Sequence, residues 1–316
     1  MKFLLLGPGG VGVYFCGRAA LGGTKVEVLP HSGFDEISEK GYSIQSIAGD
    51  FHFKPDKVLK NSASISVDID AVILSSKILP EIDRTKLLAP VKSLPGNPPI
   101  VLIQNGIGIE EEIATAFPDN EIISVIAYIG VSRNSATEIV HRGAGKLLMG
   151  SFNTPKNKVS AVEKVANAFR AGGIECTVSN DIILERWRKL LWNLPFNPLS
   201  VVAGGLHTGE LCDGGEIEKL CSALMDEVIA VANASGVKLT RKMADEQIEY
   251  TRNFPPYRTS MLQDFDAGKF LEVDAIIGNA VKIAQKHNIS VPLMSCVSVL
   301  LRSIDRKLRE QKNQHC

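Results

Sequence analysis

The fold of this chain is decided near its start, where Lys2-Phe3-Leu4-Leu5-Leu6 runs directly into Gly7-Pro8-Gly9-Gly10-Val11-Gly12. The apolar run predicts a strand, and the apolar periodicity of residues 11–21 predicts a helix behind the glycines. Residues 25–29 predict the next strand. A G-x-G-x-x-G turn between a strand and a helix is the arrangement that binds dinucleotides.

Each glycine of this turn has a physical task in such a site. Gly7 permits the tight turn, Gly9 lets the backbone approach a pyrophosphate, and Gly12 lets the helix pack on the strand. The helix N-terminus, at Gly10 and Val11, offers N–H groups and a partial positive charge to the phosphates. We therefore expect residues Gly7, Gly9, Gly10, Val11 and Gly12 to bind a dinucleotide; the alternative is a purely structural glycine-rich turn.

The composition indicates a globular protein with two domains and excludes several classes of partner. The 316 residues exceed one ordinary core. Lys+Arg and Asp+Glu are 35 each, so no net positive charge would attract nucleic acid or an anionic membrane. Apolar runs fall short of the roughly 20 residues that a bilayer span needs, and the first ends at Gly7-Pro8, too short for a signal peptide. We expect neither nucleic-acid nor membrane partners.

The six cysteines are scattered along the chain and form no C-x-x-C pair. This spacing argues against a disulfide framework and against a zinc site. It fits the reducing cytoplasm, which is the location that we expect. The six histidines are equally dispersed, so we predict no metal.

The two halves of the chain have different patterns. The first half alternates helical segments with buried strand candidates, as parallel sheets with helices on both faces do. The strand candidates are residues 70–76, 100–104, 122–129, 147–151 and 175–178, and a helix is predicted over 156–171. Beyond residue 179 almost every segment predicts helix, namely residues 181–194, 216–234, 241–252, 272–287 and 293–309. We predict domains at 1–179 and 180–316.

A polar stripe lies on the first helix of the second half. Lys189, Asn193 and Asn197 are spaced i, i+4 and i+8, so a helix places them on one face. Asparagine is a poor residue for a helix interior. The stripe therefore indicates a surface that binds something through hydrogen bonds; the alternative is a solvated face with an extended lysine.

These motifs together resemble the ketopantoate reductase (2-dehydropantoate reductase) family over nearly the whole length. The resemblance rests on the order and spacing of the Gly7–Gly12 turn, Ser76-Lys77, Gln104-Asn105-Gly106, Trp187-Arg188-Lys189-Leu190, Asn193, Asn197-Pro198-Leu199, Ser260-Met261-Leu262-Gln263-Asp264, Glu272, Gly278 and Pro292. It implies an α/β fold: an N-terminal Rossmann-type doubly wound sheet, followed by an all-helical domain of the 6-phosphogluconate dehydrogenase type.

The resemblance also implies roles for single residues. Lys189 matches the general acid of the family and Glu272 the acid that pairs with the catalytic machinery. Positions that hold the substrate match Asn193, Asn197 and Ser260. The nicotinamide side of the cofactor site matches Lys77 and Asn105, with Ser76 beside them.

The chemistry of ketone reduction agrees with these residue types. Hydride addition builds negative charge on the carbonyl oxygen, which a proton-donating lysine stabilises. Burial lowers the pKa of such a lysine, and a nearby carboxylate raises it. Purely structural alternatives exist for two residues: Ser260 with Gln263 fits a capping box, and Glu272 fits a first-turn acid favoured by the helix dipole.

Two features depart from the family pattern. His31 stands where the family has an arginine that binds the 2′-phosphate of NADPH, and no acid stands there to bind a ribose hydroxyl. We expect NADP(H) as the cofactor, with NAD(H) still allowed. Pro195 cannot donate to the carbonyl of Leu191, so we expect the helix to kink there and to re-aim Asn197.

Three functions remain open at this point. The first is NADPH-dependent reduction of 2-dehydropantoate to pantoate, in the biosynthesis of pantothenate and coenzyme A. The second is oxidation or reduction of another small 2-oxo or hydroxy acid on the same fold. The third is a dinucleotide-binding regulator without catalysis. The apolar faces of helices 216–234 and 272–287 are either core or the surface of a homodimer.

Overall fold

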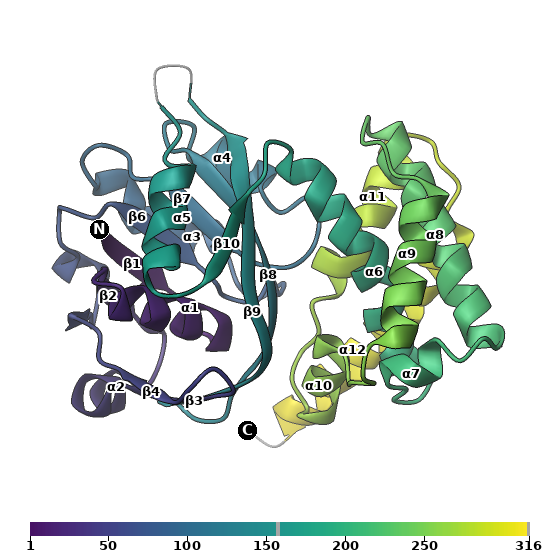
Figure 1. Ribbon diagram of the computed structural model, residues 1–316, viewed down its shortest axis with the longest axis horizontal. Helices are drawn as coiled ribbons and strands as arrows, with labels where there is room; N and C mark the ends of the chain where they lie inside the picture. Colours follow the sequence, from purple (N-terminus) through teal and green to yellow (C-terminus); the bar gives the residue numbers. More distant parts are fainter. Residues whose placement is uncertain (156–158, 315–316) are drawn as a thin grey trace. The chain divides into compact units, whose positions relative to one another are not determined.

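A computed structural model of the chain describes residues 1–155 and 159–314, in two compact units (Figure 1). The N-terminal unit comprises Met1–Lys77, Ile82–Gln104 and Glu110–Ile182. The helical unit comprises the chain from Ile183 onward together with two short segments of the first half, Ile78–Glu81 and Asn105–Ile109. Two loops of the first half therefore belong to the helical unit.

The N-terminal unit alternates strands and helices. Its strands are β1 (Lys2–Leu6), β2 (Lys25–Leu29), β3 (Tyr42–Ser46), β4 (Phe51–Phe53), β5 (Lys57–Val58), β6 (Ala71–Leu74), β7 (Ile100–Ile103), β8 (Ile122–Arg133), β9 (Glu138–Asn153) and β10 (Glu175–Val178). Its helices are α1 (Gly10–Leu21), α2 (Phe34–Lys40), η1 (Ser62–Ser64), α3 (Arg84–Leu88), η2 (Ala89–Ser93), α4 (Glu111–Ala116) and α5 (Val162–Ala171).

The strand order confirms the predicted Rossmann-type fold. Six neighbouring strands run parallel in the order β5-β2-β1-β6-β7-β8. Because β1 leads to β2 on one side while β6 lies on its other side, the strand order reverses between β1 and β6. This point of reversal, at the carboxyl ends of the strands, is where open α/β sheets bind their ligands.

A long antiparallel hairpin extends this sheet. Strand β8 turns back into β9, which also pairs in parallel with β3 and β10. The prediction placed strands over residues 122–129 and 147–151 only, and both are longer in the structure. The extra residues of β8, 130–133, are exposed or partly buried, and those of β9, 138–146, mix exposed with buried and partly buried positions. Neither stretch has the continuous apolar run that indicates a buried strand.

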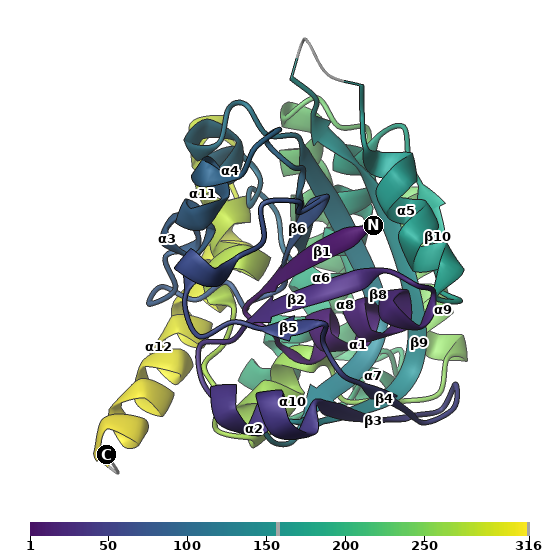
Figure 2. The same ribbon diagram turned by 90° about the vertical axis from the view of Figure 1, so that its left-hand side faces the viewer.

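Alternate residues of β1 face two separate cores. Phe3 and Leu5 belong to a cluster with α1 and α5, whereas Leu4 and Leu6 belong to a cluster with α3 and α4. This period of two is the geometry of a strand buried on both faces. Figure 2 shows the pairs α1/α5 and α3/α4 on opposite sides of β1 and β6, which gives three layers.

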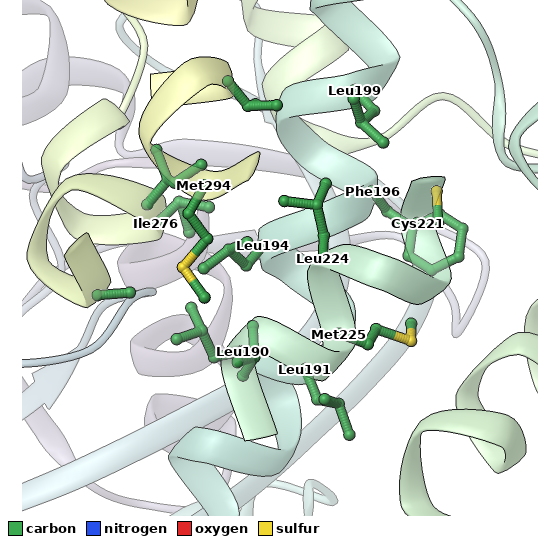
Figure 3. Close-up of a cluster of buried hydrophobic side chains, with 14 of the residues drawn as sticks. Leu190, Leu191, Leu194, Phe196, Leu199, Cys221, Leu224, Met225, Ile276 and Met294 are labelled. Carbon is green, nitrogen blue, oxygen red and sulfur yellow. The ribbon is translucent and has the colours of Figure 1, made fainter. Parts of the chain in front are cut away.

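The helical unit contains, within the described residues, no strand. Its helices are α6 (Ile182–Val202), α7 (Thr208–Leu211), α8 (Glu216–Ala234), α9 (Arg241–Asn253), α10 (Ser260–Asp266), the π-helix η3 (Asp274–Gly278), α11 (Asn279–Lys286) and α12 (Pro292–Gln314). Their core gathers Leu190, Leu194, Leu224, Ile276 and Met294 around α6 (Figure 3).

Helix α6 continues past Pro195, although the sequence predicted that the helix ends at Leu194. Pro195 and Pro198 both lie inside it. Proline removes a hydrogen bond from a helix interior and normally ends or kinks it. Here all side chains from residue 193 to residue 201 are buried, so packing holds the backbone helical despite the lost hydrogen bonds.

Two other predicted elements differ in detail. The helix predicted over 272–287 begins as the π-helix η3 and becomes α11 only at Asn279. The helix predicted over 156–171 begins at Val162, and residues 156–158 lie outside the described residues.

The contact between α1 and the sheet depends on Gly12. A Cβ atom at Gly12 would lie 2.0 Å from Ser75 Oγ and 2.9 Å from Leu5 Cδ1. Both neighbours are buried, one at the end of β6 and one in β1. Helix α1 can therefore approach the sheet this closely only where there is no side chain.

We predict that Gly12→Ala lowers the stability of the protein by about 1–3 kcal/mol, the usual cost of overpacking a core. Denaturant unfolding followed by circular dichroism measures the change. Gly10→Ala is the matched control, because the nearest atom to a Cβ there is an ordinary 3.4 Å away. Equal stability of the two variants would contradict the packing argument.

Candidate active site

The glycine turn is held against the end of β6. Gly7 has a φ of +62°, which L-residues with side chains rarely adopt, and its Cβ position is 3.0 Å from the Cβ of Ser76. Ser75 Oγ donates to the carbonyl of Gly7 over 3.3 Å. The turn and the residues after β6 therefore form one surface at the point where the strand order reverses.

The N-terminus of α1 has no side-chain cap. Gly9 is the N-cap residue, in an extended conformation, and no side chain caps the helix. The first N–H groups of a helix have no partner within it, and together with the helix dipole they bind anions. Gly10 and Val11 carry such N–H groups. These residues fit the pyrophosphate of a dinucleotide.

A buried glutamine positions Ser76, and the sequence prediction missed this residue's role. Gln104 Nε2 donates to the carbonyl of Ser76 over 2.6 Å. Buried Arg84 in turn donates to Gln104 Oε1 over 3.3 Å. The sequence predicted Gln104 only as part of the motif Gln104-Asn105-Gly106, without a role of its own. Its position at the end of β7 could have indicated that role. Lys77, next to Ser76, is partly buried.

His31 is exposed in the loop between β2 and α2. Gly33 follows in the left-handed region, with a φ of +76°, and is the N-cap of α2. The structure therefore places His31 where a ribose-binding residue of this fold is expected, after the second strand.

In the helical unit, the loop that carries Asn105 is joined to η3 by backbone contacts. Gly106 has a φ of +106°, and a Cβ there would lie 2.3 Å from the carbonyl oxygen of Ala275. Ile107 N–H donates to that oxygen over 3.1 Å, and Asn279 Nδ2 donates to the carbonyl of Ile107 over 2.9 Å. A glycine is required at 106 because two backbones meet there.

Glu272 lies just before η3 and contacts a second loop. Its Oε1 accepts a hydrogen bond from the N–H of Ile78 over 2.9 Å. Ile78 directly follows Lys77 in the chain. Its backbone carbonyl accepts from the N–H of Ile276, four residues on, and the π-helix η3 begins two residues after Glu272. π-helical turns often mark functional sites.

Helix α6 carries Lys189, Asn193 and Asn197, as predicted from their spacing. Both asparagines are buried, and Lys189 is partly buried, so the stripe is not a solvated face. Ser260 Oγ donates to Asn197 Oδ1 over 3.5 Å, which brings together two residues 63 positions apart.

The predicted capping box at Ser260 is wrong. Thr259 is the N-cap residue of α10, and its Oγ1 accepts from Leu262 N–H. Thr259 Oγ1 also lies 2.7 Å from Ser200 Oγ of α6. Because the adjacent threonine caps the helix, the hydroxyl of Ser260 is directed to Asn197 instead.

A second side chain whose role the sequence prediction missed is that of Arg186. It is 3% exposed, one helical turn before Lys189, and its Nη1 donates to the carbonyl of Gly106 over 3.2 Å. The spacing i, i+3 between two cations on a mostly apolar helix could have indicated it.

Lys189 has a pKa lowered from 10.5 to about 7. Burial is the largest cause, since it disfavours the ammonium, and the charge of Arg186 adds to the effect. Glu272 opposes both by favouring the ammonium. The pKa of a lysine in such surroundings allows it to donate or accept a proton near neutral pH.

The described residues hold no group of three or more His, Cys, Asp or Glu side chains that could bind a metal ion. Among the same residues, no helix is both long and apolar enough to cross a membrane.

Comparison with known proteins identifies the family. The sequence model described as ketopantoate reductase PanE/ApbA matches residues 3–154, and that of its C-terminal domain matches residues 181–305. A curated 2-dehydropantoate 2-reductase from Nostoc sp. is 30% identical over 311 residues, which cover 98% of this chain and 96% of the relative. The chain belongs to the ketopantoate reductase family.

Solved structures agree with this family. The crystal structure of 2-dehydropantoate 2-reductase from Methylococcus capsulatus is 36% identical, with a TM-score of 0.90 and 98% of each chain covered. A D-mandelate dehydrogenase solved with NADH and anilino(oxo)acetate has a TM-score of 0.85 at 21% identity, covering 98% of this chain and 99% of that chain, and so shares the fold. The protein is an oxidoreductase of the ketopantoate reductase type.

We predict that Arg186→Gln raises the pKa of Lys189. The arginine is a positive charge that disfavours the ammonium, so its removal stabilises the protonated lysine, and the lysine then titrates at higher pH. NMR of ¹³C-labelled lysines measures this titration directly. Arg188→Gln is the matched control, since Arg188 is exposed and pairs with Glu185. A pKa that is unchanged in Arg186→Gln would contradict the assigned cause.

Proposed function

We propose that this protein catalyses the NADPH-dependent reduction of 2-dehydropantoate to pantoate, a step of pantothenate and coenzyme A biosynthesis. The observation that carries the proposal is Lys189, whose lowered pKa suits a general acid. Family membership and the relatives named as 2-dehydropantoate 2-reductases support the choice of substrate. We propose domains at 1–179 for the cofactor and 180–316 for the substrate.

The bound nicotinamide would supply the hydride to the ketone carbon. Lys189 would then hold a proton at Nζ for the ketone oxygen, on which negative charge develops as the hydride arrives. Glu272 would favour the protonated lysine, while burial and Arg186 keep its pKa near neutral. Neutral side chains, those of Asn193, Asn197 and Ser260, would bind the substrate's carboxylate and hydroxyl oxygens without adding charge.

The cofactor would be held by residues of the N-terminal unit and by Asn105. The glycine turn, residues Gly7, Gly9, Gly10, Val11 and Gly12, would take the pyrophosphate at the helix N-terminus. His31 would lie near the adenosine ribose. Ser76, Lys77 and Asn105 would line the nicotinamide side. NADP(H) is the proposed cofactor.

A second candidate is the reduction of a larger, apolar 2-oxo acid. Trp192 stacks on Phe196 with 4.8 Å between ring centroids, and on Tyr257 with 6.0 Å. These rings come from α6 and from the segment before α10, the two elements that carry Asn197 and Ser260. If such rings faced the substrate, they would favour a bulkier side chain than that of 2-dehydropantoate.

The expected location and assembly stay predictions. The cysteines that the structure describes are free thiols, in keeping with the expected cytoplasm. The apolar faces of helices 216–234 and 272–287 belong to the core of the helical unit. The homodimer therefore stays a prediction, which sedimentation would measure.

We predict that Lys189→Ala lowers kcat for 2-dehydropantoate by at least about 100-fold, the usual contribution of a general acid. Steady-state oxidation of NADPH and of NADH, against a panel of 2-oxo acids that includes an aromatic one, measures the loss. Arg188→Gln is the control for altering a cation on the same helix. Circular dichroism of the variant checks that it is folded, so that a loss of kcat reports on the chemistry.

The panel also separates the candidate functions. Efficient turnover of only the aromatic acid would favour the second candidate and would remove the proposed pathway. Dinucleotide binding without turnover of any acid would favour the regulator. Near-normal kcat in Lys189→Ala would exclude it as the acid.

We predict that Asn193→Ala raises KM for the 2-oxo acid about tenfold, the loss of one or two hydrogen bonds, and leaves the Kd of NADPH unchanged. Asn253→Ala is the control, because Asn253 is exposed on α9. A loss of NADPH affinity in Asn193→Ala would assign the residue to the cofactor instead.

A further inference from the structure

The end of β8 and the turn that follows it lie against two parts of the expected dinucleotide site. At one side, the Cβ position of Gly10 is 3.4 Å from the backbone of Ser132 and 3.5 Å from that of Arg133. At the other side, the Cβ position of Gly33 is 3.0 Å from the Cβ of Ala136. The turn therefore connects the glycine turn with the loop that follows β2.

Arg133 is the side chain that makes this connection. Its Nη1 donates to the carbonyl of Pro8 over 2.9 Å, within the glycine turn. Its Nε donates to the carbonyl of Ser135 over 2.9 Å, and its Nη2 to that of Ala136 over 3.0 Å. The guanidinium is partly buried and is held in one orientation by three carbonyl groups. It has further N–H groups beyond those three.

The charge of Arg133 has no protein counter-ion in the part of the chain that the structure describes. All three of its acceptors are backbone carbonyls, and no carboxylate pairs with it. An arginine stays protonated at all physiological pH values. A fixed positive charge therefore stands beside the uncapped N-terminus of α1, and an anion bound there would neutralise it.

The position of this charge favours the 2′-phosphate of a dinucleotide over its pyrophosphate. The N–H groups at the start of α1 already suit the pyrophosphate. Arg133 lies instead between Pro8 and the residues that contact Gly33, which is the side of the loop after β2. In this fold that loop lies beside the 2′ position of the adenosine ribose. His31 of the same loop offers only a partial charge at neutral pH.

We propose that Arg133 binds the 2′-phosphate of NADPH and sets the preference for NADPH over NADH. This inference rests on the proposed function, since it assumes a nicotinamide dinucleotide in the N-terminal unit. Arg133, at the end of β8, would thus supply the full positive charge that His31, in the loop after β2, lacks at neutral pH.

The test measures binding of NADPH and of NADH, each alone, by titration calorimetry. Arg133→Gln should weaken the binding of NADPH by at least about tenfold, because a charge-assisted hydrogen bond is lost. The Kd of NADH should change by less than about threefold. Arg133→Lys should recover part of the NADPH affinity, because it restores the charge without the fork. Arg142→Gln is the matched control: Arg142 is exposed on β9 and donates to Ser132 Oγ of the same hairpin.

The outcomes separate this inference from the proposed function. If Arg133 has a purely structural role, Arg133→Gln weakens the binding of both dinucleotides equally, and that result would overturn the inference. Unchanged binding of NADPH would overturn it too. Both results leave the reductase assignment intact, because the unaltered protein would still bind and use a dinucleotide. If the unaltered protein binds neither dinucleotide, the proposed function fails and the inference fails with it.

Discussion

The close approach of α1 to β1 and β6 is the constraint on which the nucleotide-binding half depends. Gly12 leaves no room for a side chain against Ser75 and Leu5, and Gly7 turns the chain beside Ser76 with a positive φ. These contacts aim the uncapped start of α1 at the point where the strand order reverses. Packing therefore places the anion-binding N–H groups at this point, because Gly12 lets the helix approach the sheet closely.

In the helical unit, a close contact between two backbone segments has a similar role. Gly106 lies against Ala275, and this contact joins the loop of Asn105 to the π-helix that follows Glu272. The carbonyl of the same glycine receives Arg186 from α6. One backbone contact thus determines where the arginine sits, and the arginine in turn lowers the pKa of Lys189. The electrostatics of the proposed acid depend on a glycine 83 positions earlier in the chain.

The sequence predicted the features that depend on residues close together in the chain. The strand–turn–helix at the start and the face shared by Lys189, Asn193 and Asn197 follow from spacing alone. Predictions failed where tertiary packing opposes a local rule. Helix α6 continues through Pro195 because its surroundings are buried, and the cap of α10 is Thr259 because its hydroxyl also meets Ser200 of another helix. The π-helix at Asp274 has no pattern of its own in the sequence.

The sequence by itself determined the fold class, the family resemblance and the residue types of the site, since these depend on periodicity, glycine spacing and the order of motifs along one chain. Only the tertiary structure decided which distant groups act on one another. Arg186 contacts Gly106, Gln104 contacts Ser76, and Arg133 contacts Pro8, each through a backbone carbonyl far away in the chain. A backbone carbonyl is present at every residue, so the sequence holds no sign of which one will receive an arginine.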